Sequence, residues 1–166
     1  MSGWPTPEQA GPGQESVWDY PRPPRLEPFT GAITVELGGR VIASTTQSWR
    51  VLETSHPPTY YLPRAAFEAG VLRDAPGASM CEWKGRARYY DLVAGDTVAS
   101  RAAWTYPRPT PPFADLAGAV AVMASLVDRC LVDGETVRPQ PGGFYGGWIT
   151  SAVVGPFKGI PGSMGW

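Results

Sequence analysis

The stretch from Arg50 to Tyr61 holds the residues of this chain whose types and spacing could do chemistry. It contains the single histidine, His56, together with a guanidinium, the Glu53 carboxylate and two neighbouring phenols, Tyr60 and Tyr61. His56 precedes a Pro-Pro pair, and proline fixes its own φ and pushes the preceding residue out of the helical region. The backbone here should be stiff, and polar groups on stiff backbone suit recognition or catalysis.

Strand alternation puts the Glu53 carboxylate in an unusual place. If residues 49–54 are extended, Trp49, Val51 and Glu53 share one face, whereas Arg50 lies on the other. A carboxylate on an aromatic and aliphatic face needs a partner or an altered pKa. Glu53 is therefore a candidate general base or ligand-binding carboxylate, and a structural ion pair with an arginine is the alternative.

His56 and Lys84 complete the catalytic candidates. His56 titrates near neutral pH without special help, although a lone histidine before Pro-Pro also suits a loop hydrogen-bond donor. Lys84 belongs to a predicted strand over residues 81–90, which alternates cleanly. Its inward set is Cys81, Trp83, Ala87 and Tyr89, and its outward set is Glu82, Lys84, Arg86 and Arg88. Alternatively, Gly85 marks a bulge that turns Lys84 toward Glu53 or toward an anion.

Two aromatic faces supply neighbours for these groups. The hexapeptide from Trp18, Trp-Asp-Tyr-Pro-Arg-Pro, is echoed by Trp-Thr-Tyr-Pro-Arg-Pro from Trp104. Trp104 and Tyr106 share a face, as Trp18 and Tyr20 do, and such faces build either a core or a flat pocket. The predicted ligand-binding set is Trp18, Tyr20, Arg50, Glu53, His56, Tyr60, Trp83, Lys84, Trp104 and Tyr106.

The elements that must position these residues are mostly strands. Three segments, 35–44, 92–100 and 131–138, each join two short β-branched runs through a glycine-containing turn, which predicts hairpins. The segment 113–129 predicts the one main α-helix, because its apolar residues recur at steps of three and four. A shorter helical turn is expected around residues 65–69. The predicted class is therefore mainly β, with curved antiparallel sheets built from hairpins.

The ends of the chain differ from its middle. Residues 1–14 show no periodicity and predict a disordered tail, so that 15–166 form a single domain. The stretch 142–166 is rich in glycine, proline and aromatic residues, and we expect it to wrap over the surface as an extension.

Composition narrows the classes of function. With 14 basic and 15 acidic residues, the chain has no charge block that would favour nucleic acid or an acidic membrane. It has neither an apolar run of about 18 residues nor a basic, apolar leader, so a soluble cytoplasmic protein is expected. Cys81 and Cys130 are far apart, which indicates reduced core thiols and neither a metal site nor a cofactor.

The order of these motifs resembles the DUF427 family. The matching motifs are the hexapeptide from Trp18, the run from Val51 to Tyr61, Cys-Glu-Trp-Lys-Gly at 81–85 and Ala-Trp-Thr-Tyr-Pro at 103–107. The runs 144–150 and 154–159 are similar to a longer-tailed bacterial branch.

This resemblance implies a small, strongly curved β architecture, similar to the β-tent of methionine-sulfoxide reductases of the second type and of the ligand-binding domain of cereblon. Those relatives commonly carry a structural zinc on paired cysteines, and this chain has no such pairs. The family has also been labelled nucleotidyltransferase. The chain has no Gly-Ser followed by an Asp-x-Asp pair, the usual carboxylates for two metals.

Three functions follow as hypotheses. The leading one is a small-molecule-binding β domain with an aromatic-lined cleft. The second is an enzyme, a transferase or hydrolase on a small metabolite, with Glu53 and His56 as acid and base and with Lys84 or Arg50 stabilising negative charge. The third is a structural protein, such as a homodimer that associates through 142–166.

Overall fold

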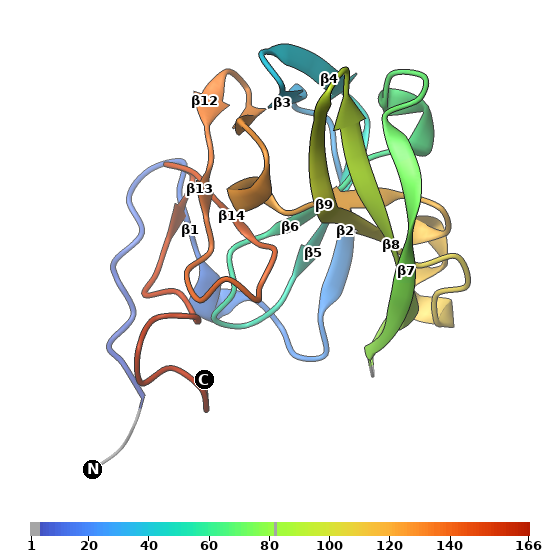
Figure 1. Cartoon of the computed structure of the whole chain (residues 1–166). Coiled ribbons are helices and arrows are strands. Elements are labelled where there is room, and N and C mark those ends of the chain that lie inside the picture. Colours follow the sequence, from blue (N-terminus) through green and yellow to red (C-terminus); the bar gives the residue numbers. More distant parts are fainter. Residues whose placement is uncertain (1–3, 82) are drawn as a thin grey trace.

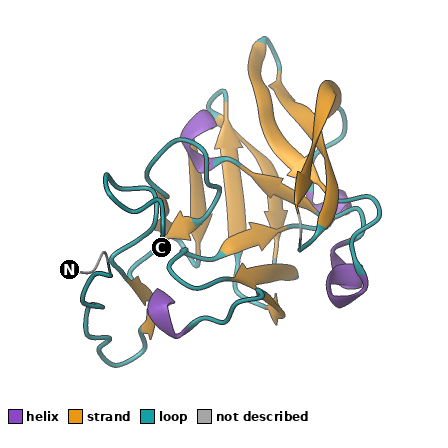
Figure 2. Cartoon of the chain, turned by 90° about the horizontal axis from the view of Figure 1, so that it is seen from below, coloured by secondary structure: helices purple, strands orange, loops and turns teal. Residues whose placement is uncertain are grey.

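The computed structural model describes residues 4–81 and 83–166 and shows a chain built mainly of strands, with several antiparallel sheets (Figures 1 and 2). The strands are β1 (Glu15–Ser16), β2 (Arg25–Phe29), β3 (Ile33–Leu37), β4 (Arg40–Thr45), β5 (Ser48–Leu52), β6 (Thr59–Tyr61), β7 (Leu72–Cys81), β8 (Gly85–Ala94), β9 (Thr97–Thr105), β10 (Val120–Val122), β11 (Arg129–Val132), β12 (Glu135–Thr136), β13 (Arg138–Pro139), β14 (Trp148–Ile149) and β15 (Val153–Val154). The 3₁₀ helices are η1 (Val17–Asp19), η2 (Arg64–Ala66), η3 (Pro111–Leu116) and η4 (Ala124–Leu126). The predicted class is confirmed.

Three antiparallel sheets form the body of the molecule, with strand orders β10-β9-β8-β7, β12-β11-β3-β4 and β2-β5-β6. The predicted hairpins at 35–44, 92–100 and 131–138 are confirmed as β3–β4, β8–β9 and β11–β12. Their turns contain Gly38, Gly39, Gly95 and Gly134, all at positive φ. Glycine reaches this backbone region without steric cost, which is why the turns could be located from local sequence.

The α-helix predicted over 113–129 is absent, and that prediction is wrong. The segment instead forms η3, strand β10 and η4 in succession. Strand β10 pairs with β9, and Val120 also exchanges two backbone hydrogen bonds with Leu62, at 2.8 and 2.7 Å. All three residues of β10 are buried, so both of its faces carry apolar side chains. A strand that is buried on both faces shows no alternation of apolar and polar residues. The apolar residues of this segment matched a helical spacing by coincidence.

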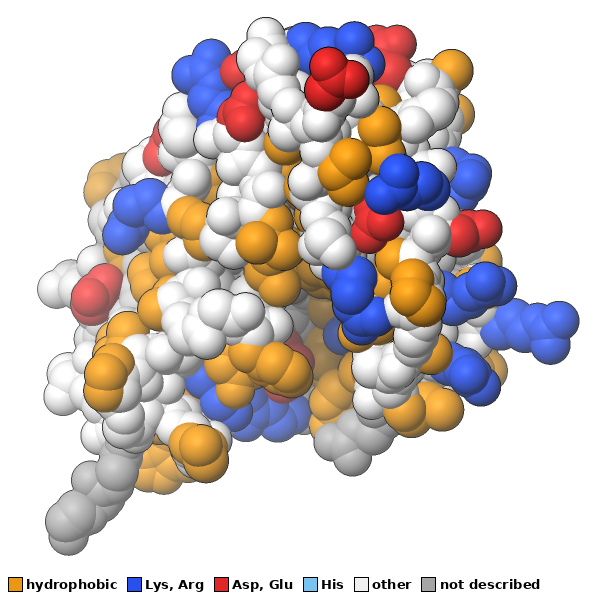
Figure 3. All heavy atoms as spheres, in the orientation of Figure 1, with side chains coloured by type: hydrophobic (Ala, Val, Ile, Leu, Met, Phe, Trp, Pro, Cys, Tyr) orange, Lys and Arg blue, Asp and Glu red, His pale blue; other side chains and the backbone are white. Residues whose placement is uncertain are grey.

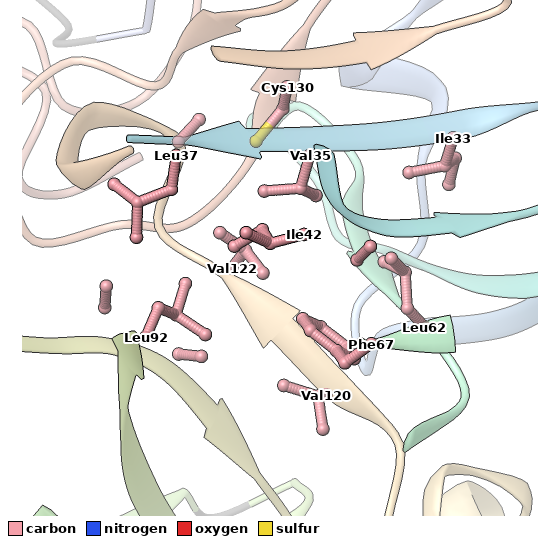
Figure 4. Close-up of a cluster of buried hydrophobic side chains, with 14 of the residues drawn as sticks. Ile33, Val35, Leu37, Ile42, Leu62, Phe67, Leu92, Val120, Val122 and Cys130 are labelled. Carbon is pink, nitrogen blue, oxygen red and sulfur yellow. The ribbon is translucent and has the colours of Figure 1, made fainter. Parts of the chain in front are cut away.

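The largest core lies between the two four-stranded sheets (Figure 4). Val35 of β3 and Ile42 of β4 face Leu92 of β8 and Val122 of β10, and each of these four side chains is fully buried. Burying one such side chain is worth about 1.5–3 kcal/mol, so this cluster holds the two sheets together. Cys130 lies within the cluster as a free thiol, and burial raises its pKa to about 12.

A second, smaller cluster lies beneath the loops that surround the cleft described below. Val51 from β5 and Tyr61 from β6 pack there with Tyr106 and with Phe113 and Leu116 of η3. Cys81, Trp83 and Trp104 pack against it as partly buried neighbours. This cluster therefore holds one side of Cys81 and of Trp104 in place, while both residues also line the cleft.

The N-terminal segment runs along the C-terminal extension (Figure 1). Strand β1 pairs in parallel with β15, and the Glu8 amide donates to the Gly155 carbonyl at 2.8 Å. Of the tail predicted to be disordered, residues 1–3 lie outside the described residues. None of the helices in the described ranges is long and apolar enough to cross a membrane.

Candidate functional site

A cleft of about 750 Å³ opens between the β7–β8–β9 hairpins and the C-terminal segment. In the space-filling view it appears as a hollow with Lys and Arg side chains at its sides (Figure 3). The predicted site residues that line it are Glu53, His56, Lys84, Trp104 and Tyr106. The main residues that sequence reasoning had not assigned to it are Tyr61, Tyr89, Arg101, Gln140, Tyr145 and Lys158.

The backbone beside His56 is held firmly from both sides. Ser55 is fully buried and has a φ of 72°, a region that costs a residue other than glycine about 1 kcal/mol or more. The Ser55 amide donates to the Val17 carbonyl at 3.0 Å, and the Ser55 carbonyl accepts from the Lys158 amide at 2.9 Å. Backbone hydrogen bonds to the N-terminal segment at Val17 and to the C-terminal segment at Lys158 therefore hold the predicted stiff segment in place.

Gln140 determines which nitrogen of His56 carries the proton. The Gln140 Oε1 accepts from the Gly147 amide at 3.0 Å, and its Nε2 donates to the Lys158 carbonyl at 2.9 Å. The same Nε2 lies 3.0 Å from His56 Nδ1, so Nδ1 must accept. In the neutral ring the proton is therefore on Nε2, which points toward Glu53.

His56 is neutral at pH 7. Burial is the main reason that its pKa falls to about 4, and the charges of Lys158, Arg22 and Lys84 lower the pKa further. The Glu53 carboxylate acts in the opposite direction, and its Oε2 lies 3.8 Å from His56 Nε2. A neutral imidazole with its Nε2–H toward the cleft is a hydrogen-bond donor.

Glu53 forms an ion pair and also lines the cleft. Its Oε2 lies 3.4 Å from Arg22 Nε, which is the structural ion pair that sequence reasoning offered as the alternative. Arg22 is anchored in turn, because it donates to the Thr54 carbonyl at 3.0 Å. Glu53 still lines the cleft, so the ion pair orients the carboxylate without removing it from the site.

Arg50 does not reach the cleft. It lies on the opposite face of β5, as alternation predicted, and is only 8% exposed. Its guanidinium donates to Glu15 Oε1 at 3.1 Å and also pairs with Glu27. Two carboxylates therefore occupy its hydrogen-bonding groups, and Arg50 has a structural role on the far side of the sheet.

The remaining predicted aromatic residues also lie outside the cleft lining. Tyr20 donates to Glu15 at 2.8 Å, and Trp18 donates to the Pro156 carbonyl at 2.9 Å. Tyr60 packs in the main core, whereas Trp83 packs against the second cluster. Of the two echoed aromatic pairs, only the one formed by Trp104 and Tyr106 faces the cleft.

The strand predicted over 81–90 is confirmed from Gly85 onward, as the start of β8, whereas the described residues between Cys81 and Gly85 belong to the turn between β7 and β8. Strand β7 ends at Cys81 and β8 begins at Gly85, whose φ is 102°. Glu82, which was predicted to face outward, lies outside the described residues. Lys84 is in the turn, where its carbonyl accepts from the Thr110 amide at 3.2 Å. The turn carries Lys84 into the cleft lining, so it is not a solvated lysine on the outer face of a strand.

Aromatic rings form the walls of the cleft. Trp104 donates its indole N–H to the Tyr61 hydroxyl at 3.2 Å, and it pairs across strands with Tyr89. The Tyr145 ring lies edge-on to His56, with 5.2 Å between the ring centroids. Gly146 presses so closely on Trp104 that a Cβ there would be 2.2 Å from the indole. The sequence signal for this close approach is the pair of glycines on each side of Phe144 and Tyr145, because glycine has no Cβ to keep another side chain at a distance.

Three cations lie along the same walls. The Lys84 ammonium is 5.7 Å from the centroid of Tyr106, and that of Lys158 is 5.8 Å from the centroid of Tyr145. The Arg101 guanidinium stacks on Tyr89 at 4.2 Å and donates to a backbone carbonyl of β7. Within the described ranges, no three His, Cys, Asp or Glu side chains cluster in a way that could hold a metal ion.

Comparison with known proteins identifies the family. A family model described as "Domain of unknown function (DUF427)" matches residues 25–133, which include Glu53, His56, Lys84 and Trp104. No curated protein matches the chain significantly. Because the matched range covers more than half of the sequence, and in agreement with the resemblance of the motifs, the chain belongs to the DUF427 family.

Proposed function

We propose that this protein binds a small molecule in the cleft between the β7–β8–β9 hairpins and the C-terminal segment. The observation that carries the proposal is the convergence of aromatic rings and hydrogen-bonding groups from distant parts of the chain on one hollow. The cleft volume, about 750 Å³, falls within the range of about 300–1,000 Å³ typical of small-molecule sites.

The walls are held in place before any ligand arrives. The hydrogen bond between Trp104 and Tyr61 orients the indole, and Gly146 packs against it. His56 is likewise fixed by Gln140. Rings and donors that need no reordering lower the entropic cost of binding, which favours a recognition role.

A fluorescence and thermal-shift screen with flat aromatic metabolites tests the proposal. We expect at least one compound to raise the Tm and quench tryptophan emission, and Trp104→Leu to weaken its binding by about tenfold or more. Trp18→Leu is the matched control, because this partly buried tryptophan lies outside the cleft lining. Equal loss in both variants, or no binding by any compound, would contradict the proposal.

One observation also favours the enzyme hypothesis as a second candidate. His56 and Glu53 lie 3.8 Å apart at the same cleft, within reach of a shared substrate. In this arrangement the Glu53 carboxylate would accept a proton, and the His56 Nε2–H would stabilise developing negative charge. The test is to incubate each compound that binds with the protein and look for conversion. Glu53→Gln should abolish conversion while the compound still binds, and binding without turnover would remove this candidate.

A further inference from the structure

We infer that the ligand of this cleft carries an uncharged group that both accepts and donates a hydrogen bond, a carboxamide or a hydroxyl, and that this group binds between His56 and Glu53. The inference rests on the proposed small-molecule binding and adds the chemical class of the ligand. It follows from the hydrogen bonds that these two side chains leave open and from the charges around them.

His56 offers one hydrogen-bond donor to the cleft. Gln140 Nε2 lies 3.0 Å from Nδ1, which leaves the proton of the neutral ring on Nε2. The distance from Nε2 to Glu53 Oε2, 3.8 Å, is longer than a hydrogen bond, and Nε2 donates to no other acceptor in residues 4–81 and 83–166. Because the ring lines the cleft, this N–H is available to a molecule that enters.

Glu53 offers an acceptor next to that donor. Arg22 Nε lies 3.4 Å from its Oε2, and this ion pair holds the carboxylate in place. None of the residues that the structure describes donates a hydrogen bond to either carboxylate oxygen. A carboxylate has about four lone-pair sites, so Glu53 can accept from a ligand while it stays beside Arg22.

The spacing of this donor and this acceptor suits a group that has both capacities. Hydrogen bonds of these types are about 2.7–3.0 Å long, so one hydroxyl oxygen can accept from Nε2 and donate to Oε2 across the 3.8 Å between them. A primary carboxamide can do the same with its oxygen and its nitrogen, which share one edge. A ligand that enters displaces water from both groups, and it loses affinity where it does not replace their hydrogen bonds.

A charged group fits between these two side chains less well. A ligand carboxylate only accepts, so its oxygens would lie against those of Glu53 and leave them without a donor. An ammonium group only donates, so it would leave the Nε2–H without an acceptor. It would also meet the charges of Lys158, Arg22 and Lys84, which add to burial in lowering the pKa of His56. The pair therefore favours an uncharged group.

Aromatic side chains in the same cleft supply a surface for the rest of the ligand. The Tyr145 ring lies edge-on to His56, with 5.2 Å between the ring centroids. Trp104 also lines the cleft, and its hydrogen bond to the Tyr61 hydroxyl orients the indole. Flat rings pack against such side chains in offset or edge-on geometry. We therefore expect the accepting and donating group to be carried on a flat ring.

Four compounds with the same indole ring test the inference. The substituents of indole-3-carboxamide and indole-3-methanol accept and donate, that of 3-acetylindole only accepts, and that of indole-3-carboxylate is an anion. The ketone matches the carboxamide in size, because a methyl group replaces the amide nitrogen. Binding would be measured by titration calorimetry with the full chain at pH 7. We expect the carboxamide or the alcohol to bind at least tenfold more tightly than the ketone and the carboxylate, because these two leave Glu53 without a donor.

Variants of Glu53 assign the preference to this side chain. Glu53→Ala removes the acceptor, so the carboxamide should lose about tenfold in affinity while 3-acetylindole does not weaken. Glu53→Gln keeps an oxygen that accepts and should retain part of the preference. Glu68→Ala removes an exposed carboxylate outside the cleft lining and should leave every affinity unchanged. Because both ligands are measured on the same protein, a folding defect would weaken both and cannot imitate the loss of the preference.

The outcomes separate this inference from the proposed function. If the ketone or the carboxylate binds as tightly as the carboxamide and the alcohol, or if the preference survives in Glu53→Ala, the inference is overturned while small-molecule binding stands. The same holds if none of the four indoles binds although another compound of the screen does. If no compound of either set binds, the proposed function fails and the inference fails with it. Tighter binding of the carboxamide or of the alcohol identifies which of the two groups the pair recognises.

Discussion

Proton binding by His56 gives the most direct test of the site geometry. In the folded chain its pKa is about 4, mainly because the ring is buried, and in the unfolded chain it returns to about 6.5. Between these two values the unfolded state binds more protons than the folded state. Stability from this residue is therefore fully present above about pH 6.5 and is lost as the pH falls toward 4.

The magnitude follows from the same two values. The difference between 6.5 and about 4 corresponds to about 3 kcal/mol in total, of which about 2 kcal/mol is lost between pH 7 and pH 5. That is a large share of the stability of an ordinary domain, which is about 5–15 kcal/mol. His56→Gln has no group that titrates in this range and should lack this part of the pH dependence.

Two measurements check this prediction. Because His56 is the single histidine, its Hε1 resonance in a chain without a histidine tag needs no assignment, and its titration midpoint should be near 4. Urea unfolding of the wild type and of His56→Gln at pH 7 and pH 5 should show free energies of unfolding that converge at the lower pH. All other titrating groups are shared by the two proteins, so they cancel in the comparison.

A midpoint near 6.5 would refute the reasoning, because it would mean that the ring is solvated and that Gln140 does not hold Nδ1 as an acceptor. Equal pH dependence in the wild type and in His56→Gln would refute it independently. In either case the neutral donor assigned to the cleft would be lost.

Two further predictions concern packing around the cleft and beneath it. Gly146→Ala would place a Cβ 2.2 Å from the Trp104 indole, so we expect a shifted tryptophan emission and weaker ligand binding, whereas Gly165→Ala, where a Cβ meets nothing within 4 Å, should change neither. Arg50→Ala leaves two partly exposed glutamates without their buried partner and should cost about 2–3 kcal/mol in urea unfolding, whereas Arg25→Ala, an exposed arginine, should cost less than about 1 kcal/mol. A loss as small for Arg50→Ala as for Arg25→Ala would contradict the structural role of the buried guanidinium.

Local chemistry made part of this site predictable. The stiff segment at His56 was indicated by its Pro-Pro pair, and strand alternation placed Arg50 opposite Glu53, as the structure shows. The hairpins were located because turn glycines report a backbone conformation that few other residues adopt. Trp104 in β9 and Tyr106 just after it both line the cleft, in agreement with the shared face that alternation predicted for them.

Long-range contacts decided the rest, and these left little trace in the sequence. Arg50 is occupied by Glu15 and Glu27, which are 35 and 23 residues away. Within the segment 113–129, residues 120–122 form strand β10 because β9 and Leu62 pair with it on either side, which the apolar spacing did not reveal. The outward-facing alternative for Lys84 was wrong because it continued the strand alternation through a position where the chain turns.

The C-terminal extension is part of the site, which bears on what can be carried from one member of the family to another. The family match ends at residue 133, so it includes His56 and Lys84 but not Gln140, Tyr145 or Lys158. Yet Gln140 decides which nitrogen of His56 carries the proton, and Tyr145 and Lys158 line the same cleft. A relative with the same matched region but a different segment after it would present another set of donors. Under the proposed function, the ligand preference of the cleft would be set jointly by the matched domain and by the C-terminal segment that lines it.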